Sequence, residues 1–190
     1  MELSRCPWAG TEQIYIDYHD KEWGIPLHDD QRLFEMLILE GMQAGLSWIT
    51  ILKKRENFRR AFDNFEAEKV ASYDSKKIEE LMQNSGIIRN RLKITAAIGN
   101  AKAFLEIQNE FSSFDKFIWS YVNGVPIVNH YKSMSEVPAN TPLSDKISRD
   151  LKKRGFNFVG TTIIYSFMQA VGMVDDHLIN CLCHTENKNS

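Results

Sequence analysis

Cysteine, an excess of one charge and long hydrophobic runs are all missing or scarce in this sequence. Its three cysteines are an odd number and too few to cross-link a chain of 190 residues, so they are more typical of a metal site than of disulfides. The apolar stretch 163–168 is far shorter than the ~20 residues that a membrane-spanning helix needs. The N-terminus also lacks a basic segment followed by an apolar one, the pattern of a secretion signal. We therefore expect a cytoplasmic protein with no membrane partner.

The charges nearly balance, with 23 basic and 25 acidic side chains and a net charge of −2. Such a chain does not coat nucleic acid non-specifically, so any nucleic-acid role must rest on local basic patches. The composition, 43% hydrophobic and 25% charged, excludes a disordered or fibrous chain. Length and composition together predict one compact domain over residues 1–185, with 186–190 as a frayed tail. Nothing indicates an oligomer, so we expect a monomer.

Helical periodicity dominates the chain, and strand patterns are nearly absent. The segment 122–128 could be an extended loop or at most a hairpin, because Gly124 and Pro126 interrupt it. The basic side chains of segment 48–62 share one helix face, which we expect to be exposed to solvent. We predict an all-α, single-domain helical bundle. The expected helices cover residues 29–43, 48–62, 75–84, 89–110, 114–122, 142–153 and 161–170, with a final helix from about 175.

Cysteine and histidine gather at the two ends of the chain. On the expected final helix, His177 and Cys181 are four residues apart, which places both side chains on one face. Cys6 and His19 would complete a tetrahedral zinc site, and four protein ligands leave no open position for water. Such a zinc is structural and would join the N-terminal and C-terminal segments. Two alternatives stay open: these residues are ordinary core residues, or the fourth ligand is Cys183 or His184.

Aromatic residues crowd the first 48 positions, around one acidic residue. Glu40 lies within the apolar run 36–42, where a buried carboxylate needs a partner or a function. Aromatic faces and a carboxylate together suit a flat cation, although a plain aromatic core is the simpler interpretation. The rings are Trp8, Tyr15, Tyr18, Trp23 and Trp48.

A basic helix end meets a glycine-rich loop at 149–162. Arg154 and Gly155 begin this loop, and Gly160 and Thr161 lead into the next helix, whose first amides are free to bind an anion. The pattern suits a DNA phosphate, but an ordinary connection between helices with a solvated basic face would look the same. A weaker version of the pattern occurs at 85–91.

Five motifs in this order closely resemble the bacterial 3-methyladenine DNA glycosylase I family, of the helix-hairpin-helix glycosylase superfamily. The resemblance extends from about residue 5 to 184. The motifs are Cys6-Pro7-Trp8, Tyr15-Ile16-Asp17-Tyr18-His19-Asp20-Lys21-Glu22-Trp23-Gly24, Leu39-Glu40-Gly41-Met42-Gln43-Ala44-Gly45-Leu46-Ser47-Trp48, Gly155-Phe156-Asn157-Phe158-Val159-Gly160-Thr161-Thr162 and Asp176-His177.

The resemblance implies an enzyme that flips N3-methyladenine out of alkylated double-stranded DNA and releases the free base 3-methyladenine. On the family's pattern Glu40 contacts the extruded base, the five rings line the pocket, and Ser166 adds a polar contact. Leu46, next to Gly45, would be the wedge that fills the gap left in the stack. The segment from Gly155 to Thr161 would hold backbone phosphates. The family's zinc ligands match Cys6, His19, His177 and Cys181, which implies one structural zinc.

Two positions differ from the wider superfamily. Members that also cut the strand carry a lysine where this chain has Thr162, so the resemblance implies hydrolysis of the base alone, without lyase activity. Asp175 stands in the place of the superfamily's catalytic aspartate and could be a remnant, an N-cap of the final helix, or a stabiliser of the sugar cation. The rival functions are a zinc-stabilised module that binds damaged DNA without cutting it, and a zinc hydrolase, which a closed metal site disfavours.

Overall fold

The computed structural model describes residues 3–188, and it is almost entirely helical, as predicted. Four short 3-10 helices supplement the α-helices, and the single sheet of this part of the chain has two parallel strands. None of the helices described is long and apolar enough to cross a membrane. The elements in chain order are η1 (Pro7–Ala9), α1 (Gln13–Lys21), α2 (Asp30–Gln43), α3 (Trp48–Ala61), η2 (Asp63–Phe65), α4 (Ala67–Ala71), α5 (Ser75–Gln83), α6 (Arg91–Phe111), α7 (Phe114–Trp119), η3 (Ser120–Val122), β1 (Ile127–Val128), η4 (Met134–Glu136), α8 (Pro142–Lys153), α9 (Thr161–Ala170), β2 (Val174–Asp175) and α10 (Thr185–Lys188).

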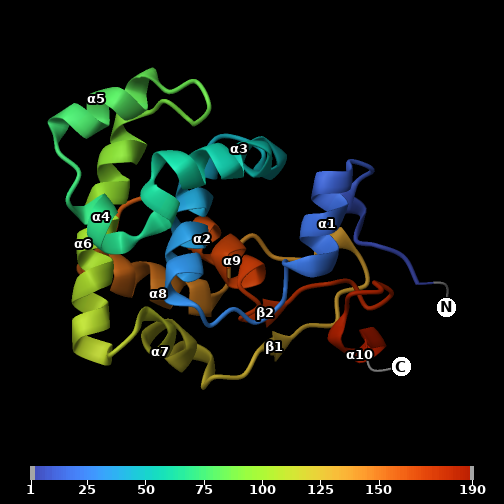
Figure 1. The fold of residues 1–190 in the computed structure, drawn as a ribbon. Coiled ribbons are helices and arrows are strands. Elements are labelled where there is room, and N and C mark those ends of the chain that lie inside the picture. Colours follow the sequence, from blue (N-terminus) through green and yellow to red (C-terminus); the bar gives the residue numbers. More distant parts are fainter. Residues whose placement is uncertain (1–2, 189–190) are drawn as a thin grey trace.

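Helix α2 forms the centre of the molecule, and it positions the site. Every residue from Leu33 to Met42 is buried, because α3, α6, α7 and α9 all pack against this helix. Figure 1 shows α2 in the middle, with α6 to its left and α9 to its right. An apolar helix surrounded in this way can hold a polar side chain only where a cavity or a partner receives it.

The predicted helix starts are confirmed where a side chain caps the backbone. Asp29 accepts a hydrogen bond from the amide of Arg32, and Thr141 and Ser144 form a capping box at the start of α8. Ser47 occupies the cap position of α3, but its hydroxyl bonds Thr50 Oγ1 instead of a backbone amide.

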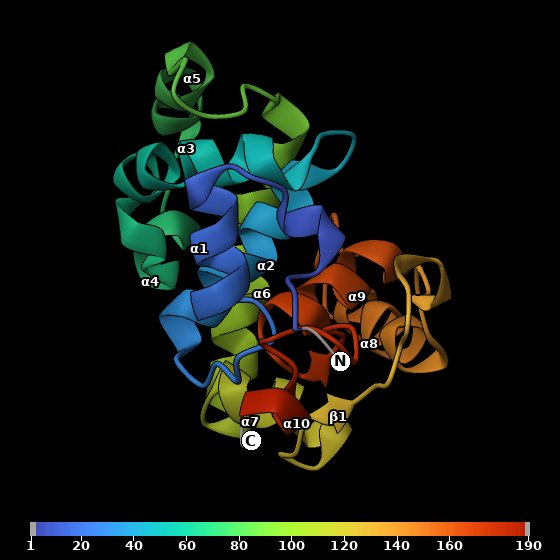
Figure 2. The ribbon, with the colours of Figure 1, turned by 90° about the vertical axis from the view of Figure 1, so that its right-hand side faces the viewer.

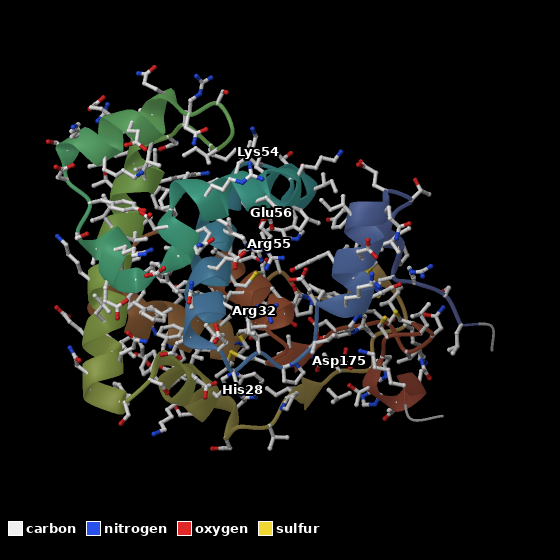
Figure 3. All side chains as sticks on the ribbon, in the orientation of Figure 1. His28, Arg32, Lys54, Arg55, Glu56 and Asp175 are labelled. Carbon is white, nitrogen blue, oxygen red and sulfur yellow. The ribbon has the colours of Figure 1, made fainter. Side chains whose placement is uncertain are left out.

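The expectation that the basic face of α3 is exposed is wrong for Arg55. This side chain is buried and points from α3 toward α2 (Figure 3). Its Nε donates to Glu35 of α2 at 2.6 Å, and its Nη1 donates to Glu22, at the end of α1, at 2.7 Å. The ion pairs tie three elements of the core together. Because a buried charge must be paired, a basic residue at an inward position is retained only with such partners.

The predicted final helix from about 175 is also wrong. After α9 the chain turns at Gly172 and forms β2. The amide of Ile127 donates to the carbonyl of Met173, just before β2, and the amide of Asn129 to that of Asp175. Residues 176–184 follow as turns and irregular chain, and α10 begins only at Thr185. Pairing with β1 therefore outweighed the helical spacing of this segment.

The two ends of the described chain lie together (Figures 1 and 2). The amide of Ser4 donates to the carbonyl of Asn180 at 3.0 Å, and the amide of Leu182 donates back to Ser4 at 2.9 Å. Residues 186–188, expected in a frayed tail, instead belong to α10, where Asn187 Nδ2 donates to the carbonyls of Ile179 and Cys181. The rest of that expected tail, 189–190, lies outside the described residues.

Candidate functional site

A cavity of about 170 Å³ opens between η1, α1, the second half of α2, the start of α3 and α9. Glu40 and the six residues that the sequence assigned to substrate binding all line it, so the structure brings the whole predicted pocket together. Its lining is Trp8, Tyr15, Tyr18, Trp23, Glu40, Gln43, Trp48, Met134, Val137, Ser166, Gln169 and Asp176.

The aromatic rings form the walls of this cavity. Trp8 lies at the centre of the group, with its ring 5.1 Å from that of Tyr15 and 4.9 Å from that of Trp23. On the other side Tyr18 and Trp48 are 5.4 Å apart. Walls made of ring faces and ring edges suit a flat ligand, and they attract positive charge.

Glu40 extends into the cavity from α2, and it is only 3% exposed. Its Oε2 has no hydrogen-bond partner among the described residues. Burial raises the pKa of this carboxyl to about 8, because a charged group loses its hydration there without gaining a counter-ion. The group is therefore mostly protonated at neutral pH, and a cation bound beside it would favour its ionised form.

Gln43, Gln169 and Asp176 also line the cavity, and the sequence interpretation had missed them. Two of them could have been found, because Gln43 lies one helical turn after Glu40 and Gln169 one turn after Ser166. Asp176 is buried, and its carboxylate accepts hydrogen bonds from Tyr165, Gln169 and Asn129 at 2.6, 2.8 and 2.7 Å. A second acidic group thus lies at the cavity wall, already satisfied by three neutral donors.

A second cluster lies where the chain ends meet, beside the aromatic wall. One donor atom from each of His19, His177, Cys181 and Cys183 lies within 4.8 Å of the others, and all four residues are buried. Each histidine Nδ1 is 2.7 Å from a carboxylate, that of Asp20 for His19 and that of Asp175 for His177. Such contacts turn both Nε2 atoms toward the cluster, the arrangement usual for histidines that bind a metal. His177 Nε2 is buried and has no hydrogen-bond partner within residues 3–188, so the donor set fits a cation such as zinc.

Cys6, a predicted ligand, adjoins this cluster. Its sulfur accepts the amide N–H of Leu178 at 3.4 Å, and its side chain also contacts Cys181. Cys181 Sγ likewise accepts the amide N–H of Cys183 at 3.4 Å. The thiol of Cys183 instead faces Asp20 Oδ1 at 3.7 Å. His184, the other alternative, lies outside the group and bonds the carbonyl of Asn129.

Asp175 lies at neither the cavity nor a helix start. Its Oδ1 faces His177 Nδ1, and its Oδ2 accepts from the amide and the hydroxyl of Thr185. The N-cap interpretation is wrong, since no helix begins here. The residue, labelled in Figure 3, therefore orients the ring of His177 and holds the start of α10.

Helices α8 and α9 form a helix-hairpin-helix, as expected. Gly155 ends α8 with a φ of +91°, and Gly160 is the residue before α9. Of the residues expected to contact DNA, Arg154 is already paired with Glu110 at 2.6 Å. The hydroxyl of Thr161 is 2.8 Å from that of Ser144. The hairpin therefore offers backbone amides more readily than these two side chains.

The expected wedge lies in the turn between α2 and α3. Gly45 adopts a φ of +80°, a conformation that favours glycine, and the next side chain, Leu46, is 41% exposed. An exposed leucine at the tip of a tight turn can enter a base stack.

Comparison with known proteins agrees with these features. A family model described as methyladenine glycosylase matches residues 8–184. The DNA-3-methyladenine glycosylase 1 of Escherichia coli (strain K12) is 53% identical over 186 residues, which are 98% of this chain and 100% of that protein. The DNA-3-methyladenine glycosylase of Haemophilus influenzae is 54% identical over 182 residues, which are 96% and 98% of the two chains.

Solved structures give the same result. A crystal structure of a 3-methyladenine DNA glycosylase I superposes with a TM-score of 0.93 at 52% identity, over 95% of this chain and 100% of that one. A variant of such an enzyme in complex with 3-methyladenine superposes with a TM-score of 0.92 at 40% identity, over 95% and 97% of the two chains.

Fold, cavity and relatives together define an enzyme of the DNA glycosylase class. Within that class, the chain belongs to the methyladenine glycosylase family.

Proposed function

We propose that this protein hydrolyses the glycosidic bond of N3-methyladenine in alkylated double-stranded DNA and leaves the strand intact. The observation that carries the proposal is Glu40, whose buried carboxyl has an unpartnered oxygen in a cavity walled by aromatic rings. N3-methyladenine is positively charged while it is attached to the sugar and leaves as a neutral base. Its glycosidic bond is therefore weak, and the enzyme needs selection more than chemical activation.

The pocket selects the cation by stacking and by charge. A cationic base gains about 0.5 to 2 kcal/mol from each desolvated ring face, whereas neutral adenine gains much less. The base also contacts Glu40. Its positive charge lowers the pKa of that carboxyl from about 8, so that the ionised form of Glu40 becomes favoured. Normal adenine offers no charge to offset the cost of ionising Glu40. Ser166 and Gln43 supply polar groups beside it in the same cavity.

Binding to DNA places the lesion at the pocket. Leu46 fills the gap left by the flipped nucleotide, and the amides of the hairpin between Gly155 and Thr161 hold the phosphates of the backbone. No Schiff base forms on the second hairpin helix, because Thr162 has no amine. The products are the free base 3-methyladenine and an abasic site in an unbroken strand.

One structural zinc joins the two chain ends, held by Cys6, His19, His177 and Cys181. The N–H groups donated to the sulfurs of Cys6 and Cys181 support these two as the thiolate ligands, whereas Cys183 faces the carboxylate of Asp20. Four protein ligands leave no position for water, so the zinc supplies stability and no step of the reaction.

The test exchanges Glu40 for glutamine, which keeps the size of the side chain and removes its charge. We expect Glu40→Gln to stay folded but to lose at least about tenfold in kcat/KM on methylated duplex DNA, the size of a lost charge-assisted contact. Glu79→Gln, on the exposed surface of α5, is the matched control and should behave as the parent does. Equal excision by Glu40→Gln and the parent would refute the role assigned to this carboxyl.

A further inference from the structure

A buried lysine lies directly behind the turn that carries Leu46. Lys93, in the first turn of α6, is only 7% exposed. Its ammonium group donates to the carbonyl of Met42 at 2.8 Å and to that of Ala44 at 2.6 Å. A buried cation without partners is costly, and carbonyls at the C-terminal end of a helix are good acceptors for it, since the helix dipole is negative there.

The hydrogen bonds of this turn show what the lysine does. Two backbone bonds close the turn on itself, from the amide of Ala44 to Gly41 and from the amide of Leu46 to Gln43. The carbonyls of Met42 and Ala44 take no part in these two bonds, and both accept from Lys93. Among the described residues, no other side chain from a different element hydrogen-bonds the backbone of residues 42–47. Lys93 is thus the one side chain of another element, among the described residues, that holds this backbone by hydrogen bonds.

The two hydrogen bonds of Lys93 lie between Glu40 of the pocket and the proposed wedge, Leu46. Met42 follows Glu40 by two residues on α2, and Ala44 precedes Leu46 by two residues. Figure 2 shows the cyan turn between α2 and α3 at the edge of the molecule, next to the light green start of α6. One ammonium group therefore fixes the position of the wedge relative to the pocket.

We propose that Lys93 is a positioning residue for base flipping, which holds the Leu46 turn rigid while the wedge enters the duplex. The proposal rests on the proposed function, because it needs Leu46 to act as the wedge. Extruding a base costs a few kcal/mol of lost stacking and pairing. If the turn were mobile, ordering it during flipping would add to this cost. A turn that Lys93 already holds in place avoids this additional cost.

The test separates flipping from pocket binding. Lys93→Met keeps the length of the side chain but leaves both carbonyls without a donor, and Lys93→Arg restores a cation. Lys102→Met is the matched control, since Lys102 is an exposed residue farther along the same helix. The measurements are kcat and KM on methylated duplex DNA, the fluorescence of 2-aminopurine placed at the flipped position, and binding of free 3-methyladenine.

We expect Lys93→Met to lose at least about tenfold in kcat with little change in KM, because flipping follows DNA binding and misplacement of a positioning group acts on the later step. The 2-aminopurine signal should fall with kcat, binding of the free base should not change, and Lys93→Arg should recover part of the activity. Two outcomes would overturn the proposal: kcat of Lys93→Met equal to that of Lys102→Met, or joint loss of free-base binding and flipping, which would mean general damage. If the parent protein itself releases no base, the proposed function fails. The effect of Lys93→Met on base flipping is then measured by the fluorescence of 2-aminopurine alone.

Discussion

At the scale of single residues, the site contains a carboxyl group whose burial lowers the stability of the folded protein. Glu40 is surrounded by aromatic rings, and its Oε2 has no hydrogen-bond partner among the described residues. The free energy lost when this group leaves water is therefore not offset by a hydrogen bond to that oxygen. The buried acids Glu35 and Asp176 differ, because each accepts several hydrogen bonds. A lone unsatisfied acid at the wall of a cavity is therefore explained by a ligand.

The pH dependence of stability follows from the same group. Its pKa is about 8 in the folded protein against the ordinary value of 4.5, so the folded state keeps a proton that the unfolded chain releases. The contribution of Glu40 to stability therefore falls as pH rises from about 4.5 to about 8. Glu40→Gln has no such proton, so relative to the parent it should gain little at pH 5 and on the order of 4 kcal/mol at pH 8.

Urea unfolding at several pH values, followed by tryptophan fluorescence, measures this gain. Glu79→Gln again serves as the control: it loses only an exposed ion pair with Arg91, so its difference from the parent should be small and the same from pH 5 to pH 8. A constant difference between Glu40→Gln and the parent from pH 5 to pH 8 would show that Glu40 is not protonated in the folded state.

At the scale of elements, helical spacing of apolar residues and residues typical of helix ends allowed prediction of the α-helices from α2 to α9 apart from the short α4. It missed α1, where Tyr15, Tyr18 and His19 look like site residues rather than a helix face. The final helix failed because its decisive interactions, the pairing of β2 with β1, join residues far apart in sequence. Local spacing cannot reveal such a partner.

The same limit applies to the site. Its place in an apolar run identified Glu40, the crowding of aromatic residues identified the rings, and the family resemblance added their roles and the wedge. The approach of Cys183 to His177 and the partners of Asp176 depend on how turns fold after β2, so residue spacing could not show them. Arg55 was misassigned for a similar reason, because its acidic partners come from other elements.

Close contact between elements gives a sharp prediction at Gly172. This residue has a φ of +71°, and a Cβ there would lie 2.4 Å from the backbone carbon of Ile25 and 2.5 Å from the nitrogen of Pro26. Backbone cannot move aside as a side chain can, so Gly172→Ala should cost on the order of 3 kcal/mol from strain and overlap.

Gly99→Ala is the matched control, since a Cβ at Gly99 meets nothing within 4 Å and alanine favours the interior of α6. Thermal unfolding should therefore show a large drop in Tm for Gly172→Ala and no drop for Gly99→Ala. Equal Tm values for the two variants would contradict the close packing of α9 on the segment after α1.

At the scale of the whole molecule, the cluster that closes the chain ends also supports the pocket. The ring of His177 lies 4.6 Å from that of Trp23, and the ring of His19 lies 5.1 Å from that of Trp8. One side of each pocket tryptophan thus rests on a proposed zinc ligand. The monomeric state and the cytoplasmic location stay predictions of the sequence.

Removal of the zinc should therefore weaken both the fold and the pocket. We expect His177→Ala to lose one equivalent of zinc, measured by atomic emission, and several degrees of Tm, because binding energy at a structural site is folding energy. Free 3-methyladenine should bind more weakly as Trp23 loses its support. The control variant His28→Ala, which loses only contacts with Asp115 and Trp119 away from the cluster, should keep the full equivalent of metal. A full equivalent of zinc in His177→Ala would contradict this ligand set.

The most direct test of the proposed glycosylase function is release of free base from methylated duplex DNA, resolved by chromatography, with strand scission followed in the same samples. We expect 3-methyladenine to appear while the strand stays intact until alkali or heat opens the abasic site. Binding of the DNA without any released base would contradict it and would indicate a damage-binding module instead.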